Sequence, residues 1–415
     1  MRLKEISMHE FDNYAINHPL GSYHQSSMYA LVMAENGYDY DCIAYFNDDD
    51  KIVAATLILH KKIGLLNKYG YSPKGFLIDY NNKDLLKRFT KDLKMHYQKK
   101  GFVFIKINPE IAIGELKDNS IKYNKNQNIL ENLEKLGYKP LKRNIYFESL
   151  IPKFNAILPL TNYSLSKISK HTRNKIKKSS KKGLQIEFGN RDSIDILYNF
   201  VKNKKDSNVL YYKDYYNVFS KKNLIDVVMV KINSGEYLVE SKKRYEEELE
   251  RNSILAENLT NNPTEKNINL KMSSDTNLAA YKEDMIEASN NYGKNNKEIY
   301  IAGALVIKHQ NRINIYISGY DKNFKNLSPN YFLHNEIFEY YKNDYEFADL
   351  NGMTGDFTKN NPYYGLNKFK EGFKPFIYEF IGELDLIIDE KNYNKLIKNG
   401  SLAEEFNKEK IINKN

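Results

Sequence analysis

The apolar stretch Ile52-Val53-Ala54-Ala55-Thr56-Leu57-Ile58-Leu59 carries the first strong structural signal of the chain. A short apolar run bounded by turn residues is typical of a buried strand. It lies within a strand predicted over residues 51–61, and the polar turn Asn47-Asp48-Asp49-Asp50 joins it to a predicted strand at residues 41–46. The two segments therefore predict neighbouring strands.

The sequence after this pair mixes helical and strand patterns. Residues 83–99 predict an amphipathic helix, because apolar side chains recur near helical spacing. These side chains are Leu85, Leu86, Phe89, Leu93 and Tyr97. Residues 102–107 predict a buried strand that ends at Asn108-Pro109. The first part of the chain therefore predicts an α/β or α+β unit with a mixed sheet.

A second unit with the same order begins near Phe154. It predicts a strand at residues 156–160, a helix to about Lys182 capped by Gly183, and a strand at 184–188. Further predicted elements are strands at 227–232, 299–309, 312–319 and 347–350, and a helix at 331–342. The pattern indicates two domains of similar construction.

A different pattern separates the strands of the second unit. Between about residues 236 and 296, apolar side chains fall on heptad positions among dense charges, and a polar break at 260–275 contains Pro263. The apolar positions are Leu238, Tyr245, Leu249, Ala256 and Leu259, then Leu278, Tyr281, Met285 and Ala288. This predicts an antiparallel helical hairpin inserted into the second domain. The expected organisation is a first domain at 1–152, a second at 153–235 and 297–400, an arm at 236–296 and a tail at 401–415.

Composition narrows the functional classes. The chain has 415 residues, enough for two or three domains, and 63 Lys and Arg against 53 Asp and Glu give a net charge of +10. This balance favours polyanionic partners: RNA, phosphorylated intermediates or an anionic membrane face. The single cysteine, Cys42, excludes an intramolecular disulfide framework and a multi-cysteine zinc site. With no apolar run long enough for a signal peptide or membrane span, we expect a cytoplasmic protein.

The densest basic segment is Lys167 to Gly183. On a helix, Leu165, Ile168, Thr172 and Ile176 would face the core. Lys170, Arg173, Lys177 and Lys181 would form one exposed row at three- and four-residue spacing. A row of like charges is tolerable where an anion binds; the alternative is a solvated face enriched in lysine by coding bias.

The segment Gly365-Leu366-Asn367-Lys368-Phe369-Lys370-Glu371-Gly372-Phe373 sets a lysine between aromatic residues, just before an apolar strand. An ammonium held in this way can stabilise a reacting oxyanion. A solvated turn before an edge strand is the alternative. The nearby stretch from Asp349 to Phe357 ends a strand in a glycine-hinged loop, which is either a site loop or an ordinary turn.

Familiar catalytic groupings are absent from the sequence. There is no Walker-type loop, dinucleotide fingerprint, His-Glu-x-x-His motif or nucleophile elbow, and the eight histidines are scattered. The sequence therefore predicts neither a metal nor a cofactor.

Several motifs together carry a family resemblance. Asn351-Gly352-x-x-Gly355, Gly365, Phe369-Lys370-x-Gly372-Phe373 and Gly382-Glu383 resemble the carboxy-terminal signature of the Fem family, the aminoacyl-tRNA-dependent transferases that build peptidoglycan interpeptide bridges. Earlier motifs follow in the family's order: Tyr23-His24-Gln25-Ser26 with Tyr29, Gly37-Tyr38, Tyr71-Ser72-Pro73-Lys74-Gly75 with Asp79-Tyr80, the basic helix at Arg173-Asn174, and Tyr215-Tyr216. The resemblance covers essentially the whole chain.

The resemblance implies two acetyltransferase-like (GNAT-like) domains with a coiled-coil arm. It implies transfer of an amino acid from aminoacyl-tRNA to the amine of a muropeptide precursor, either lipid II or UDP-linked, during cell-wall synthesis. Lys370 would stabilise the carbonyl oxyanion and Phe369 would shape the pocket. The implied substrate-binding residues are Gln25, Tyr29, Lys74, Arg173, Lys177, Tyr215, Tyr216, Asn351, Gly352 and Glu383.

Some positions depart from the family pattern, and some alternatives stay open. Met33 replaces a lysine and Val209 to Lys213 lacks the usual arginine, so the phosphate contact could fall to Lys213 or Lys74. Asn108 stands where an aspartate is common, and an asparagine cannot accept a proton as a general base at neutral pH. The alternatives are an acyl-CoA-dependent N-acyltransferase and a non-catalytic RNA- or membrane-binding module. The sequence leaves open peripheral association with the inner membrane face, and a homodimer or a complex with a related family member.

Overall fold

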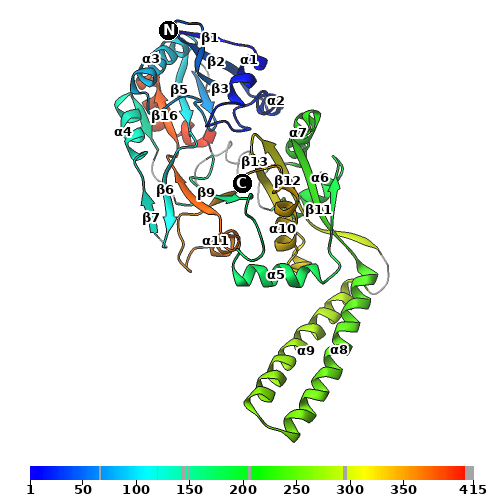
Figure 1. The fold of residues 1–415 in the computed structure, drawn as a ribbon. Coiled ribbons are helices and arrows are strands. Elements are labelled where there is room, and N and C mark those ends of the chain that lie inside the picture. The colour runs from blue at the N-terminus through cyan, green and yellow to red at the C-terminus, as the bar shows by residue number, and fades with distance from the viewer. Residues whose placement is uncertain are drawn as a thin grey trace.

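The computed structural model describes residues 1–64, 67–118, 120–141, 145–147, 150–203, 207–292 and 297–406. These residues form a mixed α/β protein with two β-sheets and a long helical hairpin that projects from the body beside the second sheet (Figure 1). This confirms the predicted fold class. The tail beyond residue 406 lies outside the described residues.

The first sheet has the strand order β1-β2-β3-β4-β5-β16-β8. Its strands are β1 (Arg2–Glu5), β2 (Asp39–Phe46), β3 (Ile52–Ile63), β4 (Asn67–Ser72), β5 (Phe102–Ile107), β16 (Leu384–Ile387) and β8 (Tyr138–Pro140). Its helices are α1 (Met8–Ala15), α2 (Ser27–Glu35), α3 (Lys83–Lys99), α4 (Gln127–Lys135) and α12 (Glu390–Lys398). The predicted strand pair is confirmed, because β2 and β3 pair in antiparallel register.

The second sheet has the order β10-β11-β12-β13-β14-β9-β15-β6-β7. Its strands are β10 (Gln185–Gly189), β11 (Ile225–Asn233), β12 (Glu298–His309), β13 (Arg312–Tyr320), β14 (Phe347–Met353), β9 (Phe154–Pro159), β15 (Phe376–Phe380), β6 (Ala112–Lys117) and β7 (Ser120–Tyr123). Its helices are α5 (Lys170–Ser180), α6 (Ser193–Val201), α7 (Val209–Phe219), α10 (Pro329–Tyr341) and α11 (Tyr364–Glu371).

Two exchanges tie the sheets together. Strands β6 and β7 come from the first part of the chain but join the second sheet, and β16 returns from the end of the chain to the first. One apolar core also runs between them, because α1 and α2 share a buried cluster with α6 and α7. We keep the division into domains at residue 152 as a proposal for the bulk of each sheet.

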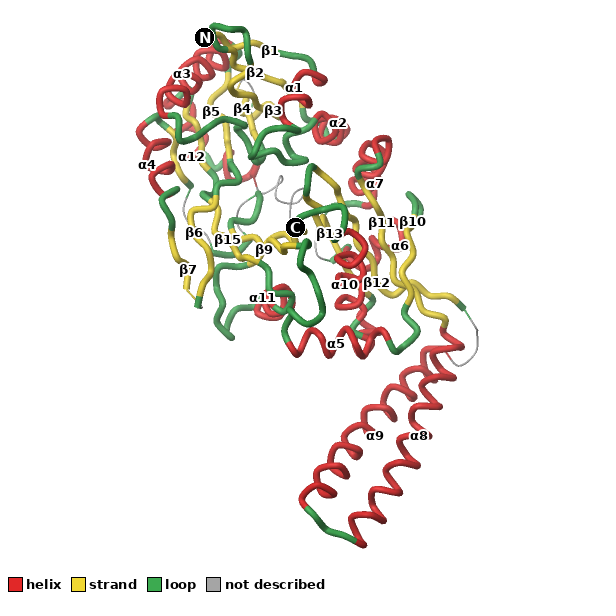
Figure 2. Tube along the Cα trace, viewed as in Figure 1, coloured by secondary structure: helices red, strands yellow, loops and turns green. Residues whose placement is uncertain are grey.

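The hairpin consists of α8 (Ser234–Asn261) and α9 (Glu265–Tyr292), an all-helical arm beside a strand-rich body (Figure 2). The predicted break at 260–275 is too long, because α9 begins at Glu265. Polar residues within this range are helical because α8 offers them partners. The buried Glu248 accepts a hydrogen bond from Ser274 at 2.6 Å, and Asn252 bonds Ser274 at 3.1 Å. Heptad reasoning on apolar positions does not detect such a polar seam.

Candidate functional site

Among the described strands, each sheet contains one parallel pair, β4–β5 in the first and β13–β14 in the second. Several of the residues singled out from the sequence lie where these pairs end. Loops at strand ends are where proteins most often place binding and catalytic groups. The two ends are therefore described in turn.

The first pair ends at Lys74 and Asn108. The amide oxygen of Asn108 accepts a hydrogen bond from the Lys74 backbone N–H at 2.8 Å, and its amide nitrogen donates to the Tyr71 hydroxyl at 3.2 Å. Lys74 is buried and has a φ of 57°, in the left-handed region that costs a non-glycine residue energy. Asn108 thus spans the two strands and holds the lysine in a strained conformation.

Gln25 links this loop to strand β3 through side-chain hydrogen bonds. It is fully buried, and its amide nitrogen donates to the Pro73 carbonyl at 2.7 Å, while its oxygen accepts from the Leu57 N–H at 2.9 Å. A side chain at Gly75 would meet the Gln25 amide nitrogen at 2.9 Å. The described contacts of Gln25 therefore position the Lys74 loop. Tyr29, also implied as a substrate contact, is buried nearby.

The side chain of Lys74 reaches a carboxylate that the sequence did not reveal. Its Nζ lies 3.3 Å from Oε2 of Glu110 and 4.9 Å from the centre of the Phe380 ring. The other oxygen of Glu110 pairs with Arg312 at the start of β13, in the second sheet. Burial raises the pKa of Glu110, but the charges of Arg312 and Lys74 outweigh it and hold the pKa at about 2. Glu110 therefore joins the two sheets as a charged carboxylate.

Glu110 and Arg312 are functional candidates that sequence reasoning missed. Glu110 directly follows Asn108-Pro109 at a strand end, which is a weak local signal. Its partner is 202 residues further along the chain. No short motif links two residues across that separation.

The two strands of the second parallel pair, β13 and β14, separate beyond Asp349. Its register runs from Arg312 opposite Phe347 to Asn314 opposite Asp349, and β14 then contains an irregularity before Gly352. Within it, Asn351 has a φ of 68° and donates from its amide nitrogen to the Tyr316 carbonyl on β13 at 3.3 Å. The predicted loop is therefore strand up to Met353.

Lys370 lies on helix α11, beside this irregularity. Its side chain is buried, and its Nζ donates to the Gly352 carbonyl at 2.6 Å. The alternative of a solvated turn before an edge strand is wrong, because Lys370 is helical and β15 pairs on both sides, with β9 and β6. A side chain at Gly352 would meet Pro152 at 2.3 Å, so the carbonyl that holds Lys370 lies in closely packed backbone. The ammonium is fixed on a rigid element, as the sequence predicts.

Phe369, the adjacent residue, points to the core beside α10. Its ring centre lies 4.9 Å from those of both Tyr331 and His334, in edge-on contacts. It thereby fixes the rotation of α11 and the direction of Lys370.

The basic helix α5 is attached to the end of α11. The Ser169 N–H donates to the Gly372 carbonyl at 2.9 Å, and a side chain at Gly372 would meet the Thr172 hydroxyl at 2.1 Å. Thr172 and Ile176 are buried, as the helical spacing predicts. The other predicted core positions, Leu165 and Ile168, precede the helix; Ile168 is buried and Leu165 packs against the same core.

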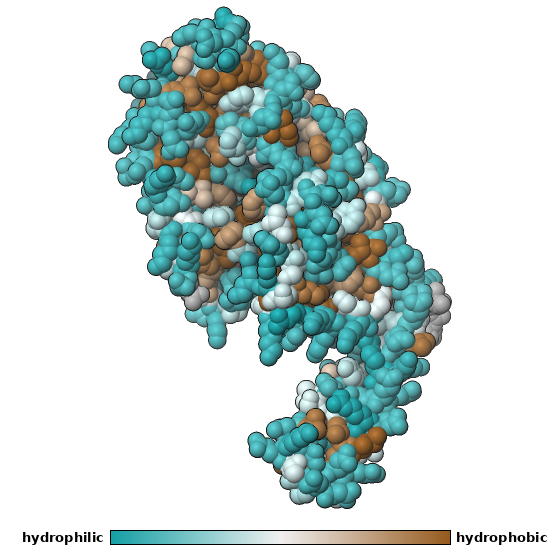
Figure 3. Space-filling view, in the orientation of Figure 1, coloured by the Kyte–Doolittle hydropathy of each residue, from teal (hydrophilic) through white to brown (hydrophobic). Residues whose placement is uncertain are grey.

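The predicted cation row runs along the solvent side of α5. Lys170, Lys177 and Lys181 are exposed, and the half-buried Arg173 bonds the Ser166 carbonyl at 3.3 Å. Figure 1 shows α5 at the edge of the body beside α11, and Figure 3 shows a mostly hydrophilic surface on this face. The row therefore lies next to the helix that carries Lys370.

The tyrosine pair lies on α7, which packs against α2 of the first part of the chain. Tyr215 is buried, its ring centre lies 4.6 Å from that of Tyr316, and burial raises its pKa well above the usual value. Tyr216 is half-buried. Of this pair, Tyr215 contributes to the shared core, and Tyr216 is the more accessible.

Glu383 is buried beside the first sheet. It lies 3.6 Å from the Nζ of Lys106, which in turn pairs with Asp385 at 2.7 Å. Burial raises the pKa of Glu383, while Lys106 lowers it. Its described contacts stabilise the return of β16 to the first sheet.

The structure defines the surroundings of the residues that depart from the family pattern. Met33 is buried in the core on α2, and Lys213 pairs with Asp195 at 2.7 Å. Lys213 already has a carboxylate partner and a half-buried position on α7. Of the two substitutes considered from sequence, Lys74 is the one at the junction of the sheets.

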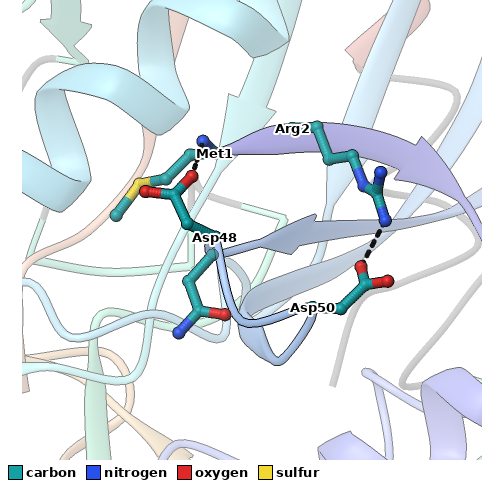
Figure 4. A pocket seen from close by; sticks show the side chains of 5 residues that line it. Met1, Arg2, Asp48 and Asp50 are labelled. Carbon is teal, nitrogen blue, oxygen red and sulfur yellow. Dashed lines mark hydrogen bonds and ion pairs between the residues drawn. The ribbon is translucent and has the colours of Figure 1, made fainter.

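Three further observations concern a surface hollow, metal ligands and membrane-spanning helices among the described residues. A surface hollow at the β1–β2 edge is lined by Met1, Arg2, Asn47, Asp48 and Asp50, where the ion pairs of Figure 4 close the strand ends, and it contains none of the predicted site residues. Within the described ranges, no group of three or more His, Cys, Asp or Glu is placed to hold a metal ion. None of the described helices is long and apolar enough to cross a membrane.

Known proteins are similar to this chain along nearly its whole length. The model of the FemAB family matches residues 6–398. Aminoacyltransferase FemA of Staphylococcus epidermidis is 24% identical over 411 residues, covering 95% of this chain and 98% of the relative. Lipid II:glycine glycyltransferase of the same species is 23% identical over 412 residues, covering 96% and 95%. The crystal structure of FemX aligns with a TM-score of 0.73 at 20% identity, covering 95% of this chain and all of that one, and so shares its fold.

Proposed function

Because the chain belongs to the FemAB family, we propose that it is an aminoacyltransferase that moves an amino acid from aminoacyl-tRNA to the amine of a peptidoglycan-precursor stem peptide. The product would extend an interpeptide bridge. The reaction is aminolysis of an ester: the acceptor amine attacks the aminoacyl carbonyl, and the ribose oxygen of the tRNA leaves.

The fixed ammonium of Lys370 is the observation that carries the proposal. Negative charge develops on the carbonyl oxygen during attack, and a preorganised donor stabilises this charge without reorganising at the moment of reaction. Lys370 is preorganised by the 2.6 Å bond to the Gly352 carbonyl and by the packing of Phe369. An activated ester needs no covalent enzyme intermediate.

We assign the anionic parts of the substrates to the cationic groups described above. Lys74 would contact a phosphate of the precursor, because it lies where the two sheets meet. The exposed row of α5, including Lys177, would contact the tRNA backbone beside Lys370. Asn351 and Gly352 would line the entrance between the parted strands, with Tyr216 at its rim.

We propose lipid II as the acceptor, because one of the similar relatives is named for its action on lipid II. A lipid-linked acceptor and a tRNA donor together would place the reaction in the cytoplasm, at the inner face of the membrane. Binding of two anionic substrates is consistent with the net charge of +10.

Incubation with radiolabelled aminoacyl-tRNAs and lipid II tests the function. Label should move to lipid II from at least one tRNA species, and the labelled species names the donor amino acid. A parallel reaction with UDP-linked precursor separates the two acceptor classes. No transfer from any aminoacyl-tRNA to either acceptor, under conditions where FemA is active, would overturn the proposal.

A further inference from the structure

The two lysines assigned to the substrates lie in different parts of the fold. Lys74 follows a strand of the first sheet, and Lys370 donates to Gly352 on β14 of the second. An acceptor held by its phosphate at Lys74 reacts only if its amine meets the aminoacyl carbonyl beside Lys370. Alignment of this kind contributes much of an enzyme's rate. The contacts that orient the first sheet against the second therefore bear on the chemistry.

An apolar core joins the two parts, through α1 and α2 on one side and α6 and α7 on the other. Burial of apolar surface is non-directional, so it specifies the orientation of the two parts less sharply. Hydrogen bonds depend on both distance and angle. The polar contacts across the boundary therefore set the finer orientation of the two sheets.

One of these contacts comes from the turn between β12 and β13. The amide nitrogen of Gln310 donates to the Ile16 carbonyl at 2.7 Å and to the His18 carbonyl at 3.2 Å, just beyond α1. The last carbonyls of a helix have no partner within the helix, and α1 has no basic residue in its last turn. A glutamine of the second sheet therefore supplies donors that α1 lacks.

The chain after α1 closes around this amide. A side chain at Gly21 would meet the Gln310 amide nitrogen at 2.3 Å and the Ala15 carbonyl oxygen at 2.7 Å. Gln310 has a φ of 50°, a costly value for a non-glycine residue that persists where surrounding contacts hold it. Shortly beyond Gly21, Gln25 bonds to the loop that carries Lys74. The segment that Gln310 holds thus leads directly to a support of Lys74.

A second contact starts from the same turn. Arg312, at the start of β13, pairs with one oxygen of Glu110, and the other oxygen lies 3.3 Å from the Nζ of Lys74. The turn therefore reaches the surroundings of Lys74 by two routes, the amide of Gln310 and this ion pair.

Resting on the proposed function, we propose that Gln310 is a positioning residue of the transfer reaction. Its bonds to the end of α1 hold the first sheet against the second, so that an acceptor bound through phosphate at Lys74 presents its amine beside Lys370. In this role Gln310 contacts neither substrate. It acts on an acceptor that contacts both sheets, namely an amine-bearing peptide joined to a phosphate.

Gln310→Glu tests this role, because it keeps the size of the side chain and replaces the donor with a carboxylate that repels the carbonyl oxygens. We expect kcat with lipid II to fall roughly tenfold or more. KM for lipid II should change little, because Asn108 and Glu110 still hold Lys74. Gln310→Lys should recover most of the rate, since an ammonium donates to the same carbonyls and is favourable at a helix C-terminus.

Asn311→Ala is the matched control. Asn311 adjoins Gln310 in the turn, but its amide nitrogen donates to Glu346 at 2.9 Å, just before β14 of the second sheet. The substitution removes a side-chain hydrogen bond from the same turn, so kcat should stay within about twofold of the wild-type value. Equal losses in Asn311→Ala and Gln310→Glu would overturn the proposal, because the effect would then belong to the turn alone.

A free stem peptide separates positioning from general damage. It carries the acceptor amine but no phosphate, so its alignment does not depend on Lys74. Gln310→Glu should leave kcat/KM for this peptide within about twofold of the wild-type value, while it lowers kcat for lipid II. Equal losses with both acceptors, or an unchanged kcat with lipid II, would overturn the role of Gln310.

A distance measurement tests the same contact without activity. Met95→Cys on α3 and Tyr340→Cys on α10 place spin labels at exposed positions of the two parts, and the native Cys42 is buried. Double electron–electron resonance should give a narrow distance distribution with the native turn and with Asn311→Ala, and a broader or shifted one with Gln310→Glu. Identical distributions would overturn the proposal. Absence of radiolabel transfer by the wild-type protein would instead defeat the proposed function and leave this measurement unaffected.

Discussion

The ends of the two parallel strand pairs share a framework and differ in electrostatics. In each, an asparagine bridges strands that part: Asn108 holds the Lys74 backbone at 2.8 Å, and Asn351 reaches the Tyr316 carbonyl at 3.3 Å. The first end holds its lysine against a charged carboxylate. The second holds Lys370 against a neutral backbone carbonyl, with the buried Asp349 nearby in β14.

We propose that the difference separates binding from chemistry. A cation with a carboxylate partner has much of its charge balanced, and can exchange that partner for a phosphate with little net change. A cation that donates to a backbone carbonyl is already oriented to donate to a developing oxyanion. Similar backbone geometry can therefore serve substrate binding or oxyanion stabilisation, depending on whether the lysine contacts a carboxylate or a backbone carbonyl.

The largest expected effect comes from Lys370→Met. We expect kcat to fall about 10²- to 10³-fold with KM nearly unchanged, because the charge that Lys370 stabilises exists only in the transition state. Single-turnover transfer from labelled aminoacyl-tRNA measures the chemical step. A higher KM with an intact kcat would place Lys370 in binding and remove the contrast between the two ends.

Lys74→Met should produce the complementary result. We expect KM for the precursor to rise roughly tenfold or more while kcat changes little, because a charge-assisted contact contributes about 1.5–3 kcal/mol in both ground and transition states. Titration of the precursor at saturating aminoacyl-tRNA measures both constants. Lys213→Met is the control, since Lys213 on α7 pairs with Asp195 on α6, and its replacement should leave both constants intact.

The stability of the protein should depend on pH with opposite signs at the two carboxylates. The pKa of Glu110 lies below its usual value, so Glu110 stabilises the fold above pH 4.5, and this contribution is lost as the pH falls towards about 2. Burial raises the pKa of Asp349, so its contribution is present at low pH and is lost as the pH rises through that pKa.

Chemical denaturation between pH 2 and pH 7 measures this contrast. Glu110→Gln should flatten the acid-induced loss of stability, and Asp349→Asn should stabilise the protein most at neutral pH. Acid curves that coincide for Glu110→Gln and the wild type would show that the Glu110 ion pairs contribute no net stability.

The smallest effect on stability is expected from replacing Asn351, which links β14 to β13. Asn351→Gly should destabilise the protein by about 1–3 kcal/mol, because it removes the side-chain hydrogen bonds to the Tyr316 carbonyl and from the Gly352 N–H, while glycine adopts a φ of 68° without strain. Asn351→Ala should cost more, since it adds strain to the same loss. Thermal unfolding of the two variants measures the difference, and equal stabilities would show that the left-handed backbone relaxes.

Much of the fold was predictable from local pattern. Residues 83–99 and 102–107 have the predicted boundaries in α3 and β5, because apolar periodicity and turn residues act over a few positions. Helix α11 (Tyr364–Glu371) was not predicted from the sequence. Gly365 and the short length of α11 disfavour a helix locally, and its stability comes from packing against α5 and α10.

The candidate site was predictable where a motif names a residue, and not where partners come from distant segments. Lys370 stands out by its setting between aromatic residues. The carbonyl that holds it, at Gly352, is 18 residues away. Every residue has a backbone carbonyl, so the sequence does not mark this one as a partner of Lys370. Glu110 and Arg312 are ordinary charged residues until the fold brings them together.

The sequence by itself determined the periodic elements, the inserted arm, the basic row and the identity of Lys370, because each rests on spacing along a few turns or on an ordered set of motifs. Tertiary structure decided the partners: which carboxylate is paired with cations, which is not, and which carbonyl holds Lys370. The physical reason is that a charge acquires its pKa and its role from neighbours and burial, and these are set by contacts between segments far apart in the chain.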